Sequence, residues 1–300
     1  MINTKETLEG VELKNPVMTA SGTFGSGAEY AEFVDLNKLG AVVTKGVANV
    51  PWPGNPTPRV AEVYGGMLNA VGLQNPGIDL FVERDIPFLK QFDTKIMVNV
   101  CGHSTEEYIE VVERLRDQPV DLLEINISCP NVKEGGIAFG QDPKAVEAIT
   151  KEMKKHAAQP VIMKLSPNVT DITEMARAAE AGGADGLSLI NTITGMKIDI
   201  NRQKFVLANK TGGMSGPAIH PVAVRMVYQT AQAVRLPIVG MGGIMNAEDA
   251  IEMILAGATA VSVGTANFTN PHVTEEIVAG IRDYMERYQV ADIRDLVGAV

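Results

Sequence analysis

The chain has 300 residues, 45% of them hydrophobic and 21% charged, which is the composition of a folded globular protein and argues against long disordered segments. Its 26 basic and 36 acidic residues give a formal net charge of −10, which argues against nucleic acid as a partner. Two cysteines cannot form a disulfide scaffold, the first residues lack a signal-peptide pattern, and no apolar run reaches the roughly 18 to 20 residues that span a bilayer, so we expect a cytoplasmic protein without membrane association.

Eight short apolar runs, rich in Val, Ile, Leu and Met, recur along the chain. Each is followed by a loop and usually by a helical pattern. Near-continuous apolar runs of this kind are typical of strands that are buried on both faces. We predict strands over residues 16–20, 41–44, 96–100, 122–127, 161–165, 186–190, 237–241 and 259–263.

Capping residues mark several helices between these strands. Ser104 precedes two glutamates, and Asp142 precedes a proline, which predicts one helix over 104–116 and another from residue 142. Further helices are expected over 171–181, 246–256 and 272–288, the first of them ending at a glycine pair.

Eight strands that alternate with helices predict an α/β fold, a single (β/α)8 TIM barrel, with an open doubly wound sheet as the alternative. Residues 1–14 read as a hairpin that caps the barrel floor. Two long segments, 46–95 and 191–216, are predicted to be inserted loops that serve substrate or cofactor at the mouth.

Polar residues and glycines follow the predicted strands, where a barrel builds its active site. Period-2 alternation places Asn99, Asn126 and Lys164 on one face of their strands, away from apolar neighbours such as Val98 and Ile125. A single buried polar side chain is usually structural, but several strands that end in the same way favour a ligand site. The residues at these ends are Ser21, Lys45, Gly46, Asn99, Asn126, Lys164, Asn191, Thr192, Gly242, Gly243, Gly264 and Thr265.

Glycines follow the seventh and eighth predicted strands, at Gly242-Gly243 and at Gly264-Thr265. Barrels often bind phosphate at these ends, because glycine lets backbone N–H groups approach an anion. The segment is not a dinucleotide fingerprint, since Met245 stands where the third glycine would be. We predict a phosphate pocket, the alternative being that the glycines only relieve packing.

Lys164 has three interpretations from sequence. It could stabilise negative charge on a reduced flavin, form a Schiff base with a carbonyl substrate, or pair with Glu124. Lys45 has the same kinds of interpretation. A thiol near the mouth could be a general base, but spacing alone does not choose between Cys129 and Cys101, and either could be a small buried apolar residue.

Several segments together resemble the class 1 dihydroorotate dehydrogenases, and in particular the NAD-linked class 1B catalytic subunit. The resemblance covers essentially the whole chain and rests on Thr19-Ala20-Ser21-Gly22-Thr23, Thr44-Lys45-Gly46, Asn69-Ala70-Val71-Gly72-Leu73-Gln74-Asn75, Asn126-Ile127-Ser128-Cys129-Pro130-Asn131, Asn191-Thr192 and the two glycine sites. It implies one FMN-binding barrel domain, residues 1–300, that oxidises (S)-dihydroorotate to orotate in pyrimidine (UMP) biosynthesis.

The resemblance also implies roles for individual residues. Cys129 would take the C5 proton of dihydroorotate while the C6 hydride passes to FMN. The implied FMN contacts are Ser21, Lys45, Gly46, Asn99, Asn126, Lys164, Ile190, Gly216, Gly242, Gly243, Gly264 and Thr265. The implied substrate contacts are Lys45, Asn69, Ala70, Val71, Gly72, Leu73, Asn126, Asn191 and Thr192.

The NAD-linked type implies a partner, an iron–sulfur flavoprotein subunit that carries FAD and a [2Fe–2S] cluster in a two-plus-two heterotetramer. Two cysteines in this chain cannot ligate such a four-cysteine cluster, so NAD would react on the partner. The alternatives are a fumarate-linked class 1A enzyme, a dihydropyrimidine dehydrogenase-like flavoenzyme, a Schiff-base lyase that uses Lys164, and a non-catalytic scaffold barrel. We expect no metal site, because the four histidines show no ligand spacing.

Overall fold

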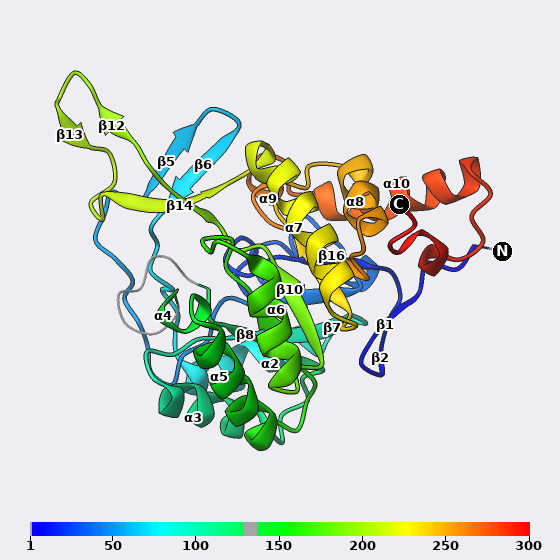
Figure 1. Cartoon of the computed structure of the whole chain (residues 1–300), viewed down its shortest axis with the longest axis horizontal. Helices are drawn as coiled ribbons and strands as arrows, with labels where there is room; N and C mark the ends of the chain where they lie inside the picture. The colour runs from blue at the N-terminus through cyan, green and yellow to red at the C-terminus, as the bar shows by residue number, and fades with distance from the viewer. Residues whose placement is uncertain (1, 129–136) are drawn as a thin grey trace.

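The computed structural model describes residues 2–128 and 137–300 (Figure 1). Its centre is a closed barrel of eight parallel strands, in which each strand pairs with its neighbours in the chain and the last pairs with the first. The prediction of a TIM barrel is confirmed, and the open doubly wound sheet is wrong. The barrel strands are β3 (Val17–Thr19), β4 (Ala41–Val43), β7 (Lys95–Val100), β8 (Leu122–Asn126), β9 (Val161–Lys164), β10 (Gly186–Leu189), β15 (Ile238–Met241) and β16 (Ala260–Val263).

Helices surround the barrel, and side-chain caps begin several of them as predicted. The two predicted caps, Ser104 and Asp142, and also Asp171 and Asn246 each accept a backbone N–H of the first turn of their helix. The longer helices are α3 (Thr105–Leu115), α5 (Pro143–His156), α6 (Ile172–Ala181), α7 (His220–Ala233), α8 (Ala247–Leu255) and α10 (Val273–Arg287). None of the helices in the described ranges is long and apolar enough to cross a membrane.

Shorter helical pieces complete the ring. Between β3 and β4 the only helical piece is the turn η1 (Leu36–Lys38), so the first unit of the barrel has no α-helix of its own. Helix α10, from the end of the chain, packs against β3 instead. The other short pieces are α1 (Ile78–Leu80), η2 (Phe81–Asp85), α2 (Ile86–Leu89), α4 (Ile137–Gly140), η3 (Pro217–Ile219), α9 (Ala266–Thr269) and η4 (Ile293–Leu296).

The two long insertions meet in space. Each contributes two strands to one antiparallel sheet of order β11-β14-β6-β5, in which Met214 of one insertion lies opposite Leu68 of the other. Figure 1 shows β5, β6 and β14 side by side at one end of the molecule, with the small hairpin β12–β13 projecting beyond them. The strands are β5 (Val60–Val63), β6 (Gly66–Asn69), β11 (Ile193–Met196), β14 (Thr211–Ser215), β12 (Ile198–Asp199) and β13 (Lys204–Phe205).

The apolar core has two layers. One lies between the barrel and the helices and includes Val98 and Ile125, as the alternation predicts. The other fills the barrel interior with side chains such as Met97 and Ile162. The predicted hairpin forms from β1 (Glu6–Leu8) and β2 (Val11–Leu13), whose leucines join this interior layer and are fully buried. The interior of the barrel is therefore packed below and open to ligand only at the other end.

Candidate functional site

A cavity lies at the carboxyl ends of the barrel strands, beneath the sheet that the insertions form. It is lined by the ends of seven of the eight barrel strands, all but β7, by residues of the insertions and by α9. The lining residues are Ala20, Ser21, Gly22, Thr23, Lys45, Val60, Met67, Asn69, Val71, Gly72, Leu73, Asn126, Lys164, Ile190, Asn191, Thr192, Ser215, Ile219, Met241, Gly242, Gly243, Ile244, Met245, Ser262, Gly264, Thr265, Ala266 and Phe268.

Most of the residues that the sequence analysis assigned to a site line this one cavity, although they come from positions 21 to 265 of the chain. Four of them stand behind its wall instead: Gly46, Asn99, Gly216 and Ala70. Cys129, the predicted base, lies outside the described residues.

Asn99 stands behind the wall because it belongs to a buried polar network. It donates to Oε2 of Glu124 and accepts from Nδ2 of Asn126 at 3.4 Å. Nζ of Lys164 lies 3.3 Å from the same carboxylate oxygen, and the hydroxyl of Ser188 donates to the other at 2.7 Å. Glu124 thus joins the strand ends of β7, β8, β9 and β10.

The network fixes the side chains that face the ligand. Glu124 is completely buried and Lys164 is only 4% exposed, so neither charge is solvated and each depends on the other. The ion pair that was one interpretation of Lys164 is therefore present. Ser188 was missed, because a serine inside an apolar run gives no signal from sequence.

Glycines close the opposite side of the cavity, at the end of β15. A Cβ on Gly242 would lie 2.7 Å from Cβ of Ala223, and one on Gly243 would lie 2.8 Å from the carbonyl oxygen of Gly216. Both glycines also have positive φ angles, of 129° and 69°. Any side chain here would strain the backbone and disturb its neighbours, so the chain meets the cavity with its own N–H groups.

The end of β16 adds further polar groups. The hydroxyl of Thr265 donates to that of Ser215 at 2.7 Å, which ties the second insertion to the barrel. Across the described residues, the backbone N–H groups of Gly243, Gly264 and Thr265 have no acceptor. The buried hydroxyl of Ser262 lines the cavity and also has no partner within the described ranges. These are the groups that an anionic ligand would satisfy.

The first insertion supplies another wall, over residues 69–73. Its backbone is held by Asn55, whose Nδ2 donates to the carbonyl of Ala70 at 3.0 Å. Ala70 itself is fully buried, which explains why it does not reach the cavity. Gly72 bends the chain with φ of 74°, so that Val71 and Leu73 face the ligand space.

Asn191 and Thr192 form the wall next to that loop. Nδ2 of Asn191 donates to the hydroxyl of Ser128 at 2.8 Å. The backbone carbonyl of Thr192 accepts from Asn168 at 3.0 Å. The side-chain amide of Asn191 is thereby oriented by the residue that immediately precedes Cys129.

Cys101, the other candidate thiol, is fully buried in a small apolar cluster with Ala48 and Trp52. It does not line the cavity. The structure therefore favours the interpretation of Cys101 as a small buried residue.

Comparisons with known proteins agree with this geometry. The family model for dihydroorotate dehydrogenase matches residues 3–285. The chain belongs to the dihydroorotate dehydrogenase family. A protein of Lachnoclostridium phytofermentans named "Dihydroorotate dehydrogenase B (NAD(+)), catalytic subunit" is 72% identical over 100% of both chains. A protein of the same name from Alkaliphilus metalliredigens is 65% identical over 100% of this chain and 99% of its own.

Similarity of the same kind extends to more distant relatives. A protein of Caldicellulosiruptor bescii with the same name is 53% identical over 100% of this chain and 99% of its own. Such identity over the whole length confirms the resemblance to the NAD-linked type that the sequence motifs indicated. The chain is thus a member of an oxidoreductase family.

The residues of this family member fit a ligand with an anionic group at one end and a planar polar ring at the other. The N–H groups of Gly243 and Gly264, which have no acceptor in the described part of the chain, suit the anion, and Lys164 and Asn126 supply a cation and an amide to the ring. Several lining residues gave no separate signal from sequence, among them Met67, Ser215, Ser262 and Phe268.

Proposed function

We propose that this chain is the catalytic subunit of an NAD-linked dihydroorotate dehydrogenase, which oxidises (S)-dihydroorotate to orotate in pyrimidine synthesis with FMN bound in the mouth of the barrel. One observation carries the proposal. One cavity joins N–H groups at the ends of β15 and β16, which have no acceptor among the residues that the structure describes, to a buried Lys164–Glu124 pair on the opposite strands.

FMN would lie across this cavity. Its phosphate would meet the N–H groups of Gly243, Gly264 and Thr265, with Gly242 shaping the turn. Its ring would lie against Asn126, Lys164 and Ile190, while Gly46, Asn99 and Gly216 support this wall from behind. Ser21 and Lys45 would contact the flavin from the ends of β3 and β4. Bound FMN supplies the acceptor for the hydride that leaves C6 of dihydroorotate.

Dihydroorotate would occupy the space between the flavin and the insertions. Its carboxylate suits the cation of Lys45, and its imide edge suits the amides of Asn126, Asn191 and Asn69. The loop of residues 69–73 and Thr192 would cover the remaining side of the substrate and help to exclude water.

Cys129 is the proposed general base at C5. The family resemblance supports this role, and so does the position of Cys129 directly after Ser128, whose hydroxyl is bonded to Asn191 of the cavity wall. The thiolate would take the C5 proton and hold it while the product forms. Cys101, buried behind the wall, is the less suitable thiol.

An electron-transfer partner belongs to the proposal. The relatives are named as catalytic subunits of an NAD(+) enzyme, which supports a second subunit here as well. We propose that it is an iron–sulfur flavoprotein with FAD and a [2Fe–2S] cluster, joined to this chain in a two-plus-two heterotetramer, and that the assembly is cytoplasmic. The fumarate-linked class 1A enzyme is the close alternative for the acceptor.

The first test uses the purified chain without oxygen. Addition of dihydroorotate is expected to bleach the visible flavin absorption rapidly, because the first half-reaction needs only this subunit. A yellow protein that stays yellow would reject dihydroorotate as the substrate of the isolated chain. A colourless protein, with substrate trapped on Lys164 by borohydride, would reject the flavin assignment in favour of a lyase.

The second test concerns the base. Cys129→Ala is expected to keep FMN bound and to slow flavin reduction by about 10²–10⁴-fold, the usual effect of losing a general base. Anaerobic stopped-flow absorption measures the rate. Cys101→Ala is the matched control and should reduce its flavin at close to the normal rate. Normal reduction in Cys129→Ala, or a comparable loss in Cys101→Ala, would reject the assignment.

A further inference from the structure

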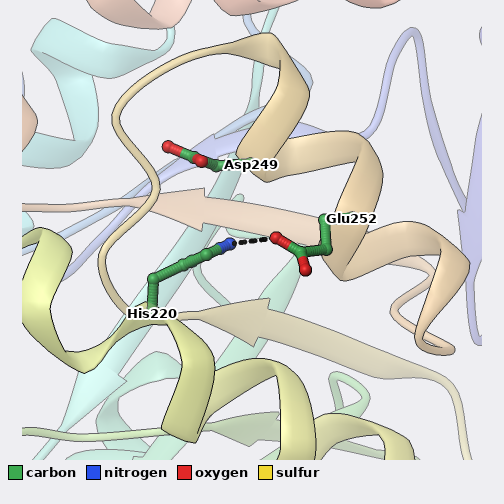
Figure 2. Close-up of side chains that lie close together, drawn as sticks. All are labelled: His220, Asp249 and Glu252. Carbon is green, nitrogen blue, oxygen red and sulfur yellow. Dashed lines mark hydrogen bonds and ion pairs between the residues drawn. The ribbon is translucent and has the colours of Figure 1, made fainter.

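His220 stands directly behind the glycine turn of the cavity, outside the lining. Its Nδ1 lies 2.8 Å from the carbonyl oxygen of Gly242, and its Nε2 lies 3.2 Å from Oε2 of Glu252 (Figure 2). The side chain of His220 is 9% exposed, whereas that of Glu252 is 60% exposed. The ring is therefore held between the turn and Glu252, which lies in the second half of α8.

The ring's hydrogen bonds assign a direction to the contact. A carbonyl oxygen can only accept, so Nδ1 of His220 carries the proton that bonds to Gly242. The carboxylate of Glu252 can only accept as well, so the two contacts together need a proton on each ring nitrogen. With both contacts made, the ring is restrained from rotating, much as outer-shell partners orient functional imidazoles. His220 begins α7 and Glu252 lies on α8, so two helices fix the ring against the turn.

The peptide that joins Gly242 to Gly243 links the contact with His220 to the direction of the Gly243 N–H. The cis peptide bonds of the described chain lie elsewhere, so this peptide is trans, and its N–H points away from its C=O. With the Gly242 carbonyl turned toward His220, the Gly243 N–H turns away from it. Gly243 lines the cavity and His220 does not, and this N–H has no acceptor among the residues described.

We propose that His220 is a positioning residue for the anion site: its hydrogen bond to the Gly242 carbonyl, steadied by Glu252, aims the Gly243 N–H at the ligand phosphate. The inference rests on the proposed FMN function, whose phosphate occupies this end of the cavity. A donor that is already oriented binds the anion without the loss of conformational entropy that ordering the turn would require. Two glycines with positive φ would otherwise leave this peptide free to rotate.

The same neighbourhood also brings Asp249 close enough that its carboxylate, His220 and Glu252 could together ligate a metal ion. The spacing of the histidines could not predict this group, because Asp249 and Glu252 come 29 and 32 residues after His220 in the chain. However, Asp249 already accepts the N–H of Met245 at 2.8 Å, and the contact drawn in Figure 2 joins only His220 and Glu252. We therefore favour positioning over metal binding.

The experiment compares FMN with riboflavin, which has the same ring but no phosphate. Flavin is removed from the full chain, and each ligand is titrated by fluorescence quenching. His220→Phe fills a similar volume without a donor, and it should weaken FMN binding about 10- to 100-fold, the range for a hydrogen bond to a charged group. Riboflavin binding should change by less than about twofold, since the positioned donor faces only the phosphate.

Rescue separates positioning from a general packing effect. The amide nitrogen of Asn can occupy the place of Nδ1, so His220→Asn should restore most of the FMN affinity. His156→Phe is the matched control, because His156 contacts Glu113 on the outer surface and should leave both affinities unchanged. Circular dichroism and the melting temperature check that each variant is folded.

The outcomes are distinct. Equal losses of FMN and riboflavin in His220→Phe, or no rescue by His220→Asn, would overturn the inference while leaving the FMN assignment intact. A wild-type chain that binds neither flavin, or binds riboflavin as tightly as FMN, would overturn the assignment as well. One-to-one Zn²⁺ uptake that His220→Phe abolishes, with unchanged flavin selectivity, would make the cluster a metal site instead.

Discussion

Glu124 is completely buried, and its two carboxylate oxygens receive Lys164, Asn99 and Ser188. A buried charge of this kind persists only when its partners compensate for lost hydration. The pairing with Lys164 could be predicted from sequence, since both residues occupy interior positions on adjacent strands. The hydrogen bond from Ser188 could not be predicted, because the alternation of residues shows which face of a strand a side chain occupies but not which residue it contacts.

Lys164→Met should destabilise the flavin-free protein by about 3–5 kcal/mol, because it leaves the Glu124 carboxylate buried without its cation. Urea unfolding measures the change. The double variant Lys164→Met/Glu124→Gln should recover part of the loss, since the uncompensated charge is gone. Lys151→Met, which breaks an exposed pair with Glu147, should cost less than about 1 kcal/mol. A loss of similar size in both single variants would contradict the argument.

Glu6 is a second buried carboxyl group, and burial raises its pKa. It is 4% exposed on the floor hairpin, and burial raises its pKa from 4.5 to about 6, although its bond from the Thr7 N–H and the charge of Arg294 oppose the rise. The folded state therefore holds this proton more tightly than the unfolded chain. Its contribution to stability is complete below about pH 4.5 and is lost as pH rises through about 6.

Glu6→Gln should remove this pH dependence. From well below pH 4.5 to well above pH 6 the wild-type protein should lose about 2 kcal/mol relative to the variant, which follows from the size of the pKa shift. Urea unfolding at a series of pH values gives the comparison. Parallel stability curves for the two proteins across this range would show that Glu6 does not titrate in this way.

At the level of elements, local signals were sufficient for the barrel. Each predicted barrel strand agrees with the structure to within one residue at either end, and the side-chain oxygens at the starts of four predicted helices each accept a backbone N–H of the first turn. Helix α7 was not singled out, because it begins at His220 without a side-chain cap. Strong local patterns fix elements whose partners are close in sequence.

The sheet of the two insertions could not be predicted in the same way. Its central pair joins β6 to β14 across about 145 residues of chain, and the strands are short and only half buried. Neither insertion alone carries the alternation that would identify a paired edge. Sequence therefore predicted the location and the general role of the insertions but not their contact with each other.

Gly66 and Gly216 allow that contact. A Cβ on Gly66 would fall 1.9 Å from the carbonyl oxygen of Ser215, so Gly66→Ala should separate β6 from β14 at this end. We expect the barrel to remain folded by circular dichroism while substrate binding weakens about tenfold or more, because a wall of the cavity is displaced. Substrate titration of flavin absorption measures the change.

Gly195→Ala is the control for this prediction. It lies in the same sheet, but its new Cβ would be crowded by Cδ2 of Leu68 alone, at 3.1 Å, because Cβ of Met214 lies at an ordinary contact distance of 3.9 Å. The Leu68 methyl group can move aside. Its effect on substrate binding should be small. Equal effects of the two substitutions, or none from Gly66→Ala, would show that the pairing of the insertions does not shape the site.

At the scale of the whole molecule, the barrel separates stability from chemistry. Its floor is closed by the apolar hairpin and an interior layer of large side chains, whereas its mouth gathers glycines, amides and the buried ion pair. This division is general for the fold. It explains why the positions of the strand ends in the sequence were enough to identify the region of the site. The placement of Cys129 relative to the cavity stays a prediction.

The amino-terminal segment of the chain, next to the hairpin β1–β2, lies against the carboxyl-terminal segment. Asn3 bridges to Asp292, with backbone bonds to Ala291 and from Ile293 of 2.8 and 3.0 Å. Figure 1 shows both ends of the chain on the same side of the molecule, away from the projecting hairpin β12–β13. The two ends could therefore be joined by a short glycine-rich linker without crossing the mouth.

Such a circular permutant, reopened between Asn201 and Arg202 in the exposed tip of β12–β13, should fold, because the order of the barrel strands in space is unchanged. We expect its melting temperature to fall only by a few degrees and its flavin content to stay near normal. A control reopened between Ile125 and Asn126, inside β8, should fail to fold. The new ends of the first permutant would stand at the projecting tip of β12–β13, on the mouth side of the barrel, where a reporter or a redox module could be fused without disturbing the floor.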